Sequence, residues 1–129
     1  KANDATFFEE IIDGCGFEII TSQAISTSWR LGDRSHRSEL CSLYIRQNTE
    51  KFRIQKIKCE NGLIRRDLRL TVDYPEDLIV CRSIYMNLVK GSLNSMVDIK
   101  EAVAYLDSNP NLKDLISPFT QSGYSTMYL

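Results

Sequence analysis

Histidine and closely spaced cysteines are nearly absent from this 129-residue chain, which limits the metal chemistry that its own residues can support. His36 is the only imidazole, and the four cysteines, Cys15, Cys41, Cys59 and Cys81, include no Cys-x-x-Cys pair. Because structural zinc sites draw on closely spaced ligands, the sequence predicts no zinc site and reduced, partly buried thiols. His36 and Cys41 are five residues apart and would not face each other on a helix, so they form a poor nucleophile pair.

Long apolar stretches are lacking as well. No run approaches the roughly 18 apolar residues that cross a bilayer, and the first residues lack the basic and apolar regions of a secretory signal. We therefore expect no membrane association and a cytoplasmic location. With 43% hydrophobic and 26% charged residues, the composition is that of a globular chain of single-domain size, neither disordered nor fibrous.

Charge is balanced over the whole chain, with a net charge of −1, but one stretch between residues 46 and 69 is basic. Three interpretations stay open for it: a solvated strand edge protected by lysines, a site for phosphate or a sugar carboxylate, or non-specific contact with nucleic acid. The overall pI near 5.9 argues against a dedicated nucleic-acid binder. The basic residues of the stretch are Arg46, Lys51, Arg53, Lys56, Lys58, Arg65, Arg66 and Arg69, against the acids Glu50, Glu60 and Asp67.

The most informative part of the chain runs a strand directly into a helix and leaves Asp73 at the junction. Apolar and polar residues alternate over 68–73, which predicts a strand. Pro75 suits the first turn of a helix, two acids follow it at the positive end of the helix dipole, and Lys90-Gly91 closes the apolar pattern. This predicts a helix over 75–89.

Asp73 has two interpretations at this position. Ligands of open α/β sheets bind beyond the carboxyl ends of the strands, so a carboxylate held there is a candidate metal or substrate ligand. Alternatively, Asp73 caps the following helix, as aspartate often does.

The other patterns alternate between strands and helices, so the predicted fold class is α/β. The polar, turn-rich segment 117–129 is expected to be a flexible tail. We predict strands over 17–21 and 52–59, and helices over 22–31, 35–47, 97–106 and 112–116.

The Asp73 stretch, Leu-Arg-Leu-Thr-Val-Asp-Tyr-Pro-Glu-Asp-Leu, resembles the strand-to-helix motif near the C-terminus of a cytidylyltransferase family. This family contains the spore coat polysaccharide biosynthesis proteins, and its relatives activate acylneuraminate and 3-deoxy-manno-octulosonate sugars. Further segments match in the family's order, although Ile12, Gly16 and Leu40 replace its usual proline, aspartate and histidine, which leaves the sugar open. The matching segments are 12–20 with Glu18, 37–45 with Glu39, Tyr44 and Ile45, 48–54 with Phe52 and Ile54, and 97–112 with its Leu-Asp-x-x-Pro-x-Leu sequence.

The resemblance implies both a fold and a site. The fold would be the C-terminal part of a Rossmann-like nucleotidyltransferase, a three-layer sandwich of the nucleotide-diphospho-sugar transferase type. Asp73 would be the catalytic carboxylate and a ligand of Mg²⁺. Glu18 would orient the sugar, and Arg37, Glu39 and Arg69 are further candidates for substrate binding.

Two parts of the family pattern are missing from this chain: the glycine-rich basic loop that wraps the nucleotide phosphates and the middle Asp-x-Asp-type motif. We therefore expect residues 1–116 to be the C-terminal, sugar-binding and dimerisation half of a nucleotidyltransferase domain. The full-length parent would transfer CMP from CTP to a sugar, as a homodimer without nucleic-acid partners, whereas the fragment alone would be inactive. The alternative is a non-catalytic dimerisation or ligand-binding module of the same fold.

Overall fold

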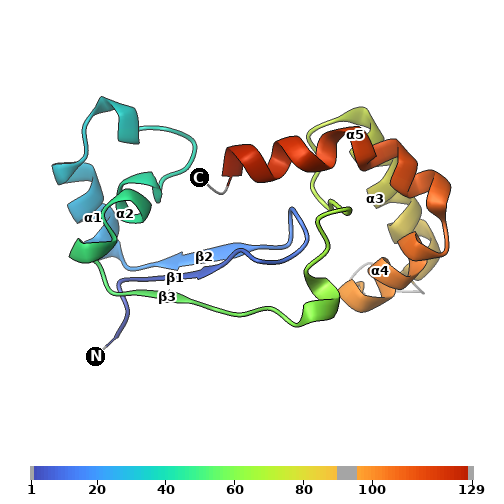
Figure 1. Cartoon of the computed structure of the whole chain (residues 1–129), viewed down its shortest axis with the longest axis horizontal. Coiled ribbons are helices and arrows are strands. Elements are labelled where there is room, and N and C mark those ends of the chain that lie inside the picture. Colours follow the sequence, from blue (N-terminus) through green and yellow to red (C-terminus); the bar gives the residue numbers. More distant parts are fainter. Residues whose placement is uncertain (1, 90–95, 128–129) are drawn as a thin grey trace. The chain divides into compact units, whose positions relative to one another are not determined.

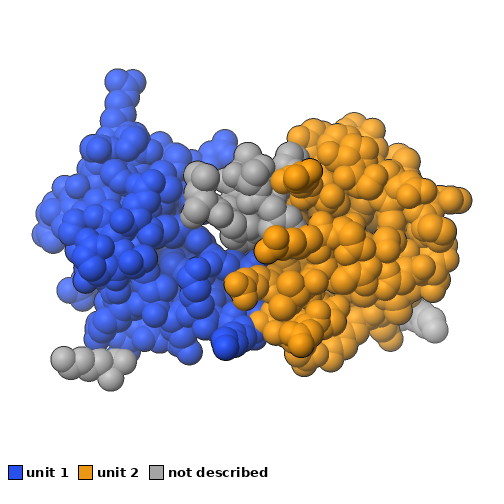
Figure 2. Space-filling model, viewed as in Figure 1, with its two compact units in different colours: residues 1–9, 16–58 blue, residues 10–15, 59–129 orange. Residues whose placement is uncertain are grey.

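The computed structural model describes residues 2–89 and 96–127, which form two compact units. Unit 1 consists of residues 1–9 and 16–58, and unit 2 of residues 10–15 and 59–129 (Figure 2). The sequence predicted one half-domain over 1–116, and the structure divides that span. Residues 10–15 belong to unit 2 because they bond to its later segments: the Ile12 N–H donates to the Leu63 carbonyl at 3.1 Å.

A three-stranded sheet in the order β2-β1-β3 is the framework of unit 1 (Figure 1). Strand β1 (Ala5–Phe8) runs antiparallel to β2 (Phe17–Ile20) and parallel to β3 (Ile54–Lys56). The sequence predicted β2 and a longer version of β3 but missed β1. A strand this short has little local signature, and its parallel pairing joins it to β3, which is far away in the sequence.

Two helices pack on this sheet and close the core of unit 1. Helix α1 (Ser22–Leu31) has the predicted bounds, and its N-terminus is capped by the Thr21 hydroxyl, which accepts from the Ala24 N–H at 3.2 Å. Helix α2 (Leu43–Gln47) is short and is flanked by two 3-10 turns, η1 (Arg34–His36) and η2 (Thr49–Lys51). The buried core consists of Ala5, Phe7, Ala24, Tyr44, Ile45 and Phe52.

The helix predicted over 35–47 is broken in the middle, so only η1 and α2 are helical there. Serine is frequent in this span, and serine hydroxyls compete with the helix backbone for hydrogen bonds. Ser42, just before α2, donates its hydroxyl to Glu18 at 2.8 Å rather than capping the helix. As a result, Arg37 and Glu39 lie in an irregular segment between η1 and α2.

Three helices form the body of unit 2: α3 (Pro75–Leu88), α4 (Ile99–Asp107) and α5 (Pro110–Met127) (Figure 1). The start of α3 confirms the prediction, whereas the predicted closure at Lys90-Gly91 lies outside the described residues. A 3-10 turn, η3 (Asn61–Leu63), precedes the Asp73 segment. Buried apolar side chains of this unit are Ile11, Ile12, Leu68, Val80, Ile84, Ala102, Val103, Leu106 and Ile116.

The strand predicted over 68–73 does not form. This segment makes one isolated parallel bridge, between Asp13 and Arg69, with the Leu70 N–H donating to the Asp13 carbonyl at 2.7 Å. The burial also departs from the expected alternation, because Arg69 is 2% exposed beside the buried Leu68, while Val72 is 54% exposed. A charged side chain can be buried when carboxylates surround it, and Arg69 has such partners.

The flexible tail predicted over 117–129 is helical as far as Met127, and residues 128–129 lie outside the described part. Helix α5 passes through Pro118, which lacks the N–H that would bond to the Asp114 carbonyl. The Ser117 hydroxyl donates to that carbonyl at 3.0 Å instead. The local sequence does not predict this helix, and its packing against α3 and α4 stabilises it.

The described residues therefore form a mixed α/β protein with one three-stranded sheet and five α-helices, which confirms the predicted α/β class. Within the described residues, no helix combines the length and the apolar character that crossing a membrane requires.

Candidate functional site

Asp73 lies directly before α3, and its carboxylate is held from one side. Arg69 donates from Nη2 to Asp73 Oδ2 at 2.7 Å, and the Thr71 hydroxyl donates to the same oxygen at 3.3 Å. The Asp73 side chain nevertheless remains 62% exposed. The structure therefore presents a fixed, solvent-facing carboxylate at the entry to a helix.

Arg69 is the buried centre of this arrangement. Its Nη2 donates to Asp77 Oδ2 at 3.0 Å, and its Nη1 donates to the Phe119 carbonyl at 2.9 Å. Nη1 also lies 3.7 Å from Asp13 Oδ2, and Nε lies 2.8 Å from Asp77 Oδ1 without the alignment of a hydrogen bond. The sequence proposed Arg69 as a substrate contact. In the structure the Arg69 guanidinium is instead buried, and it binds the carboxylates of Asp73 and Asp77 and the Phe119 carbonyl.

Asp77 caps α3, a role that the sequence left open for Asp73. Its Oδ2 accepts from the backbone N–H groups of Asp73 and Tyr74, both at 3.0 Å. A carboxylate in the first turn satisfies donors that have no partner inside the helix. Because Asp77 takes this role, the carboxylate of Asp73 is free to face solvent.

Asp13 is the third carboxylate around Arg69, and it is almost completely buried. Burial, and the nearby negative charges of Asp73 and Asp77, raise the pKa of Asp13, while Arg69 works in the opposite direction. Gly14 makes this placement possible: its φ is +87°, and its Cα packs directly against the backbone of residues 70–71.

The carboxylates of this cluster do not by themselves make up a magnesium site. Among the described residues, no group of three or more histidine, cysteine, aspartate or glutamate side chains is arranged to hold a metal ion. Asp13 and Asp77 are turned onto Arg69, which takes the central place that a cation would need. Asp73 is thus the one carboxylate of the cluster that faces outward.

Glu18, proposed from the sequence to orient a sugar, belongs to a partly buried ion-pair cluster in unit 1. It accepts hydrogen bonds from Arg46 Nη2 and from the Ser42 hydroxyl. Arg46 also donates to Glu9 at 2.6 Å and stacks on Phe7, 4.2 Å from the ring centroid. Burial tends to raise the pKa of Glu9, but hydrogen bonds from Lys56 and Arg46 bring it below its usual value.

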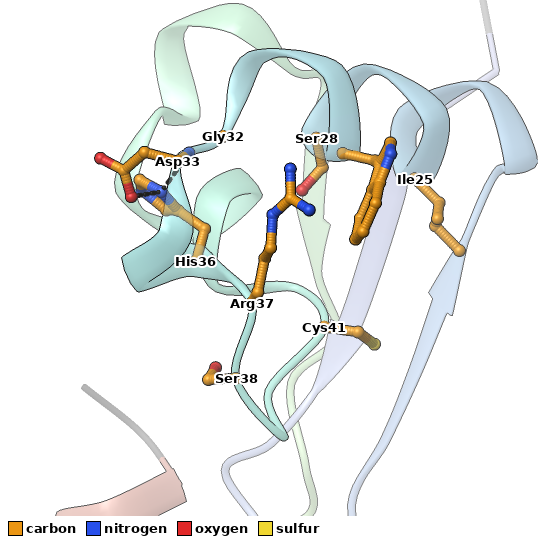
Figure 3. Close-up of a pocket in the computed structure, with 9 residues that line it drawn as sticks. Ile25, Ser28, Gly32, Asp33, His36, Arg37, Ser38 and Cys41 are labelled. Atoms are coloured by element: carbon orange, nitrogen blue, oxygen red, sulfur yellow. Dashed lines mark hydrogen bonds and ion pairs between the residues drawn. The ribbon is translucent and has the colours of Figure 1, made fainter.

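Arg37 lines a pocket of about 150 Å³ in unit 1 (Figure 3). Its guanidinium lies over the Trp29 ring, 3.8 Å from the centroid, and points toward Ser28 in Figure 3. It forms no ion pair with any described residue. On the far wall, His36 Nδ1 lies 2.8 Å from Asp33 Oδ1, which turns the imidazole away from Cys41. The pocket therefore offers a preoriented guanidinium to an anionic group.

Within the stretch 46–69, acids from elsewhere in the chain pair with most of the basic residues. Arg53 pairs with Asp4 at 2.8 Å, and Arg65 binds Asp107 with both terminal nitrogens. Lys56 lies on the edge strand β3, which agrees with the interpretation of a lysine-protected edge. The stretch is divided between the two units.

Of the predicted site residues, the structure brings together Arg69 and Asp73 in unit 2. The others, Glu18, Arg37 and Glu39, belong to unit 1. Glu39 is exposed in the irregular segment before α2. Sequence reasoning missed Asp13 and Asp77 as members of the Asp73 cluster. The acid four residues after Asp73 was a detectable capping signal. Asp13 carried no such signal, because its role depends on a contact with Arg69 far along the chain.

All four cysteines are free thiols, as the sequence predicted. Burial raises the pKa of Cys15 to about 11, so this thiol stays protonated at neutral pH. Cys41 is the exception to the predicted partial burial, since it is exposed.

Comparison with known proteins finds a related sequence. The chain is 28% identical over 116 residues to an uncharacterized protein of Methanocaldococcus jannaschii. The match covers 90% of this chain and 46% of the relative, so the chain spans about half the length of that protein. No family model matches the chain, and no solved structure matches it.

Proposed function

We propose that this chain is the C-terminal half of a Rossmann-like nucleotidyltransferase domain of the cytidylyltransferase type. The longer parent would act in the cytoplasm and transfer CMP from CTP to a sugar, with acidic sugars as the first candidates. Pyrophosphate is released, and the product is a nucleotide sugar for surface polysaccharide biosynthesis.

The observation that carries the proposal is the Asp73 carboxylate. It lies at the entry of α3, 62% exposed, with its Oδ2 fixed by Arg69. Polar groups held at the start of a helix after an extended segment are typical of ligand sites in α/β proteins. Asp73 is not needed as the cap of α3, because Asp77 already takes that role.

Two further features support the view that unit 2 is part of a larger domain. Helix α3 carries a second apolar face, with Leu78, Ile79, Tyr85 and Met86 exposed on the side away from its buried Val80. A helix that is apolar on both sides is usually covered on both sides. The single parallel bridge at Arg69 is likewise the kind of pairing that parallel sheets bury between layers. The relative, about twice as long, has room for such a covering layer.

The proposed reaction forms a bond between a sugar oxygen and the α-phosphorus of CTP and breaks the α–β phosphoanhydride bond; the sugar oxygen loses its proton to a base or to water. Catalysis of this class depends on positioning and on a divalent cation that neutralises phosphate charge. This chain would offer such an ion one ligand, Asp73, and the other ligands would come from the part of the parent outside this chain. Arg37 would contact an anionic group, with Glu18 and Glu39 as proposed sugar contacts.

The test is magnesium-dependent pyrophosphate release from CTP with a panel of acidic sugars. Three proteins are compared: the full-length parent, the parent with Asp73→Ala, and the parent with Asp114→Ala, an exposed carboxylate on α5 as the matched control. We expect Asp73→Ala to lower the rate by about a hundredfold or more, as loss of a metal ligand does, and Asp114→Ala to leave it unchanged. Absence of release with every sugar would contradict the proposal.

A non-catalytic dimerisation module is the second candidate, and one observation favours it. Unit 1 exposes Phe17, Ile19 and Trp29 to 47%, 63% and 63%, and exposed apolar groups of this kind mark interaction surfaces. Sedimentation velocity of the chain with Ile19→Lys, against Gln23→Lys as a control on exposed α1 surface, tests it. Dimerisation lost only in Ile19→Lys, together with an inactive parent, would favour this candidate.

A further inference from the structure

We infer that the C-terminal helix α5 positions the Asp73 carboxylate, with Arg69 and Phe119 as positioning residues. A catalytic role for this positioning rests on the proposed function. The structural coupling between α5 and Asp73 can be tested separately, from the NMR signal of the Asp73 carboxyl group. The segment beyond residue 116 was expected to be a flexible tail, so this coupling was not predicted.

One guanidinium joins α5 to Asp73. Arg69 Nη1 donates to the Phe119 carbonyl at 2.9 Å, while Nη2 donates to Asp73 Oδ2 at 2.7 Å. Because the guanidinium is planar and its donors are fixed relative to each other, binding on one nitrogen fixes the direction of the other. The position of the Phe119 carbonyl therefore helps to determine where the Asp73 carboxylate points.

A second contact couples α5 to the residue after Asp73. The rings of Phe119 and Tyr74 stack with their centroids 4.2 Å apart and an interplanar angle of 17°. The Arg69 guanidinium also lies 5.4 Å from the Tyr74 ring centroid. Phe119 thus contacts the site twice: its carbonyl accepts from the Arg69 guanidinium, and its ring stacks on the ring of Tyr74.

These contacts differ from those that anchor α5 to unit 2. Ile116 is fully buried, and Lys113 pairs with Asp107 at 3.1 Å and with Asp67 at 3.2 Å. Removing the Phe119 ring should therefore leave α5 in place and change mainly the site. A substitution at Ile116 should lower the stability of unit 2 and leave the Asp73 site unchanged. It therefore serves as a matched control for lost stability.

The experiment uses the whole chain labelled with ¹⁵N and with ¹³C at the aspartate carboxyl carbons. Asp73→Asn identifies the Asp73 carboxyl signal, and Phe119→Ala, Phe119→Tyr and Ile116→Val are compared with the natural chain. Hydrogen exchange of the Asp73 and Tyr74 amides is measured as well, because both amides are bonded to Asp77. Urea unfolding of each variant gives its overall stability.

We expect Phe119→Ala to shift the Asp73 carboxyl signal and to speed exchange of the two amides by about two- to tenfold, as loss of an aromatic pair implies. Phe119→Tyr should restore both readouts. Ile116→Val should lower the urea midpoint without moving the Asp73 signal, and Arg69→Lys should move that signal because lysine lacks the planar fork.

The inference is overturned if Phe119→Ala leaves the Asp73 signal unchanged, or if Ile116→Val moves it as much, since the coupling would then be absent or merely reflect stability. Failure of the proposed function gives a different result, namely no pyrophosphate release from the parent with any sugar. The two failures are therefore distinguishable.

Discussion

Gly14→Ala should destabilise unit 2 severely, because the structure leaves no room for a Cβ at this position. An added Cβ would lie 2.6 Å from the carbonyl carbon and oxygen of Leu70 and 2.7 Å from the Thr71 nitrogen. All three are backbone atoms, so no side chain can move aside. The φ of +87° adds a second penalty, because residues other than glycine seldom adopt it.

The expected loss combines these two effects. A left-handed conformation costs an alanine about 1–2 kcal/mol, and overpacking of a closely packed contact typically adds about 1–3 kcal/mol. We therefore expect a loss of about 2–5 kcal/mol, a large part of the roughly 5–15 kcal/mol that stabilises a natural protein. The backbone of Asp13 would shift as well, which would disturb its contact with Arg69.

Urea unfolding followed by circular dichroism measures this loss as a lower midpoint at an unchanged slope. Gly62→Ala is the matched control, because a Cβ there meets nothing within 4 Å and its φ is not positive. We expect that variant to stay within about 0.5 kcal/mol of the natural chain or to gain slightly. If both alanine variants unfold at the same midpoint, the close approach of Gly14 to residues 70–71 is refuted.

Two further predictions concern single side chains. Hydrogen bonds from Arg65 lower the pKa of Asp67 from 3.8 to about 2, so the stabilising effect of Asp67 is complete above pH 3.8 and disappears as the pH falls through about 2. Asp67→Asn should therefore lose stability less steeply with falling pH over that window, as measured by acid unfolding. An unchanged dependence of stability on pH would contradict the pairing. Trp29 is the only tryptophan of the chain, so Arg37→Ala should change the intrinsic fluorescence while the unfolding free energy changes by less than about 1 kcal/mol, as expected for an exposed cation–π pair. Arg30→Ala, on exposed α1 surface, should leave the emission unaltered, and equal spectra for both variants would count against the stack.

The reliable sequence predictions were those whose causes lie within one helix. Helix α1 has the predicted bounds because its cap at Thr21 and its apolar spacing are both local. The start of α3 was predicted from Pro75 and the two acids behind it, and the structure has these residues in the first turn. Asp73 was likewise found by its place before this helix.

Predictions failed where a distant partner decided the outcome. The alternation over 68–73 pointed Arg69 outward, but the distant Asp13, together with Asp77 in the first turn of α3, makes its burial favourable. Strand β1 was missed because it is only four residues long and its parallel partner β3 is remote in sequence. The tail beyond residue 116 is helical because it packs on α3 and α4, which its own composition does not indicate.

The sequence by itself determined the α/β class, the position and start of the main helices, the reduced cysteines and the junction where Asp73 lies. These properties follow from capping, periodicity and composition, which act over a few residues. Only the tertiary structure decided that Arg69 is buried, that Asp13 lies against it, and that Phe119 reaches the site. Those outcomes depend on desolvating a charge among carboxylates and on packing distant segments together, and such energies are set by three-dimensional contacts that no local pattern encodes.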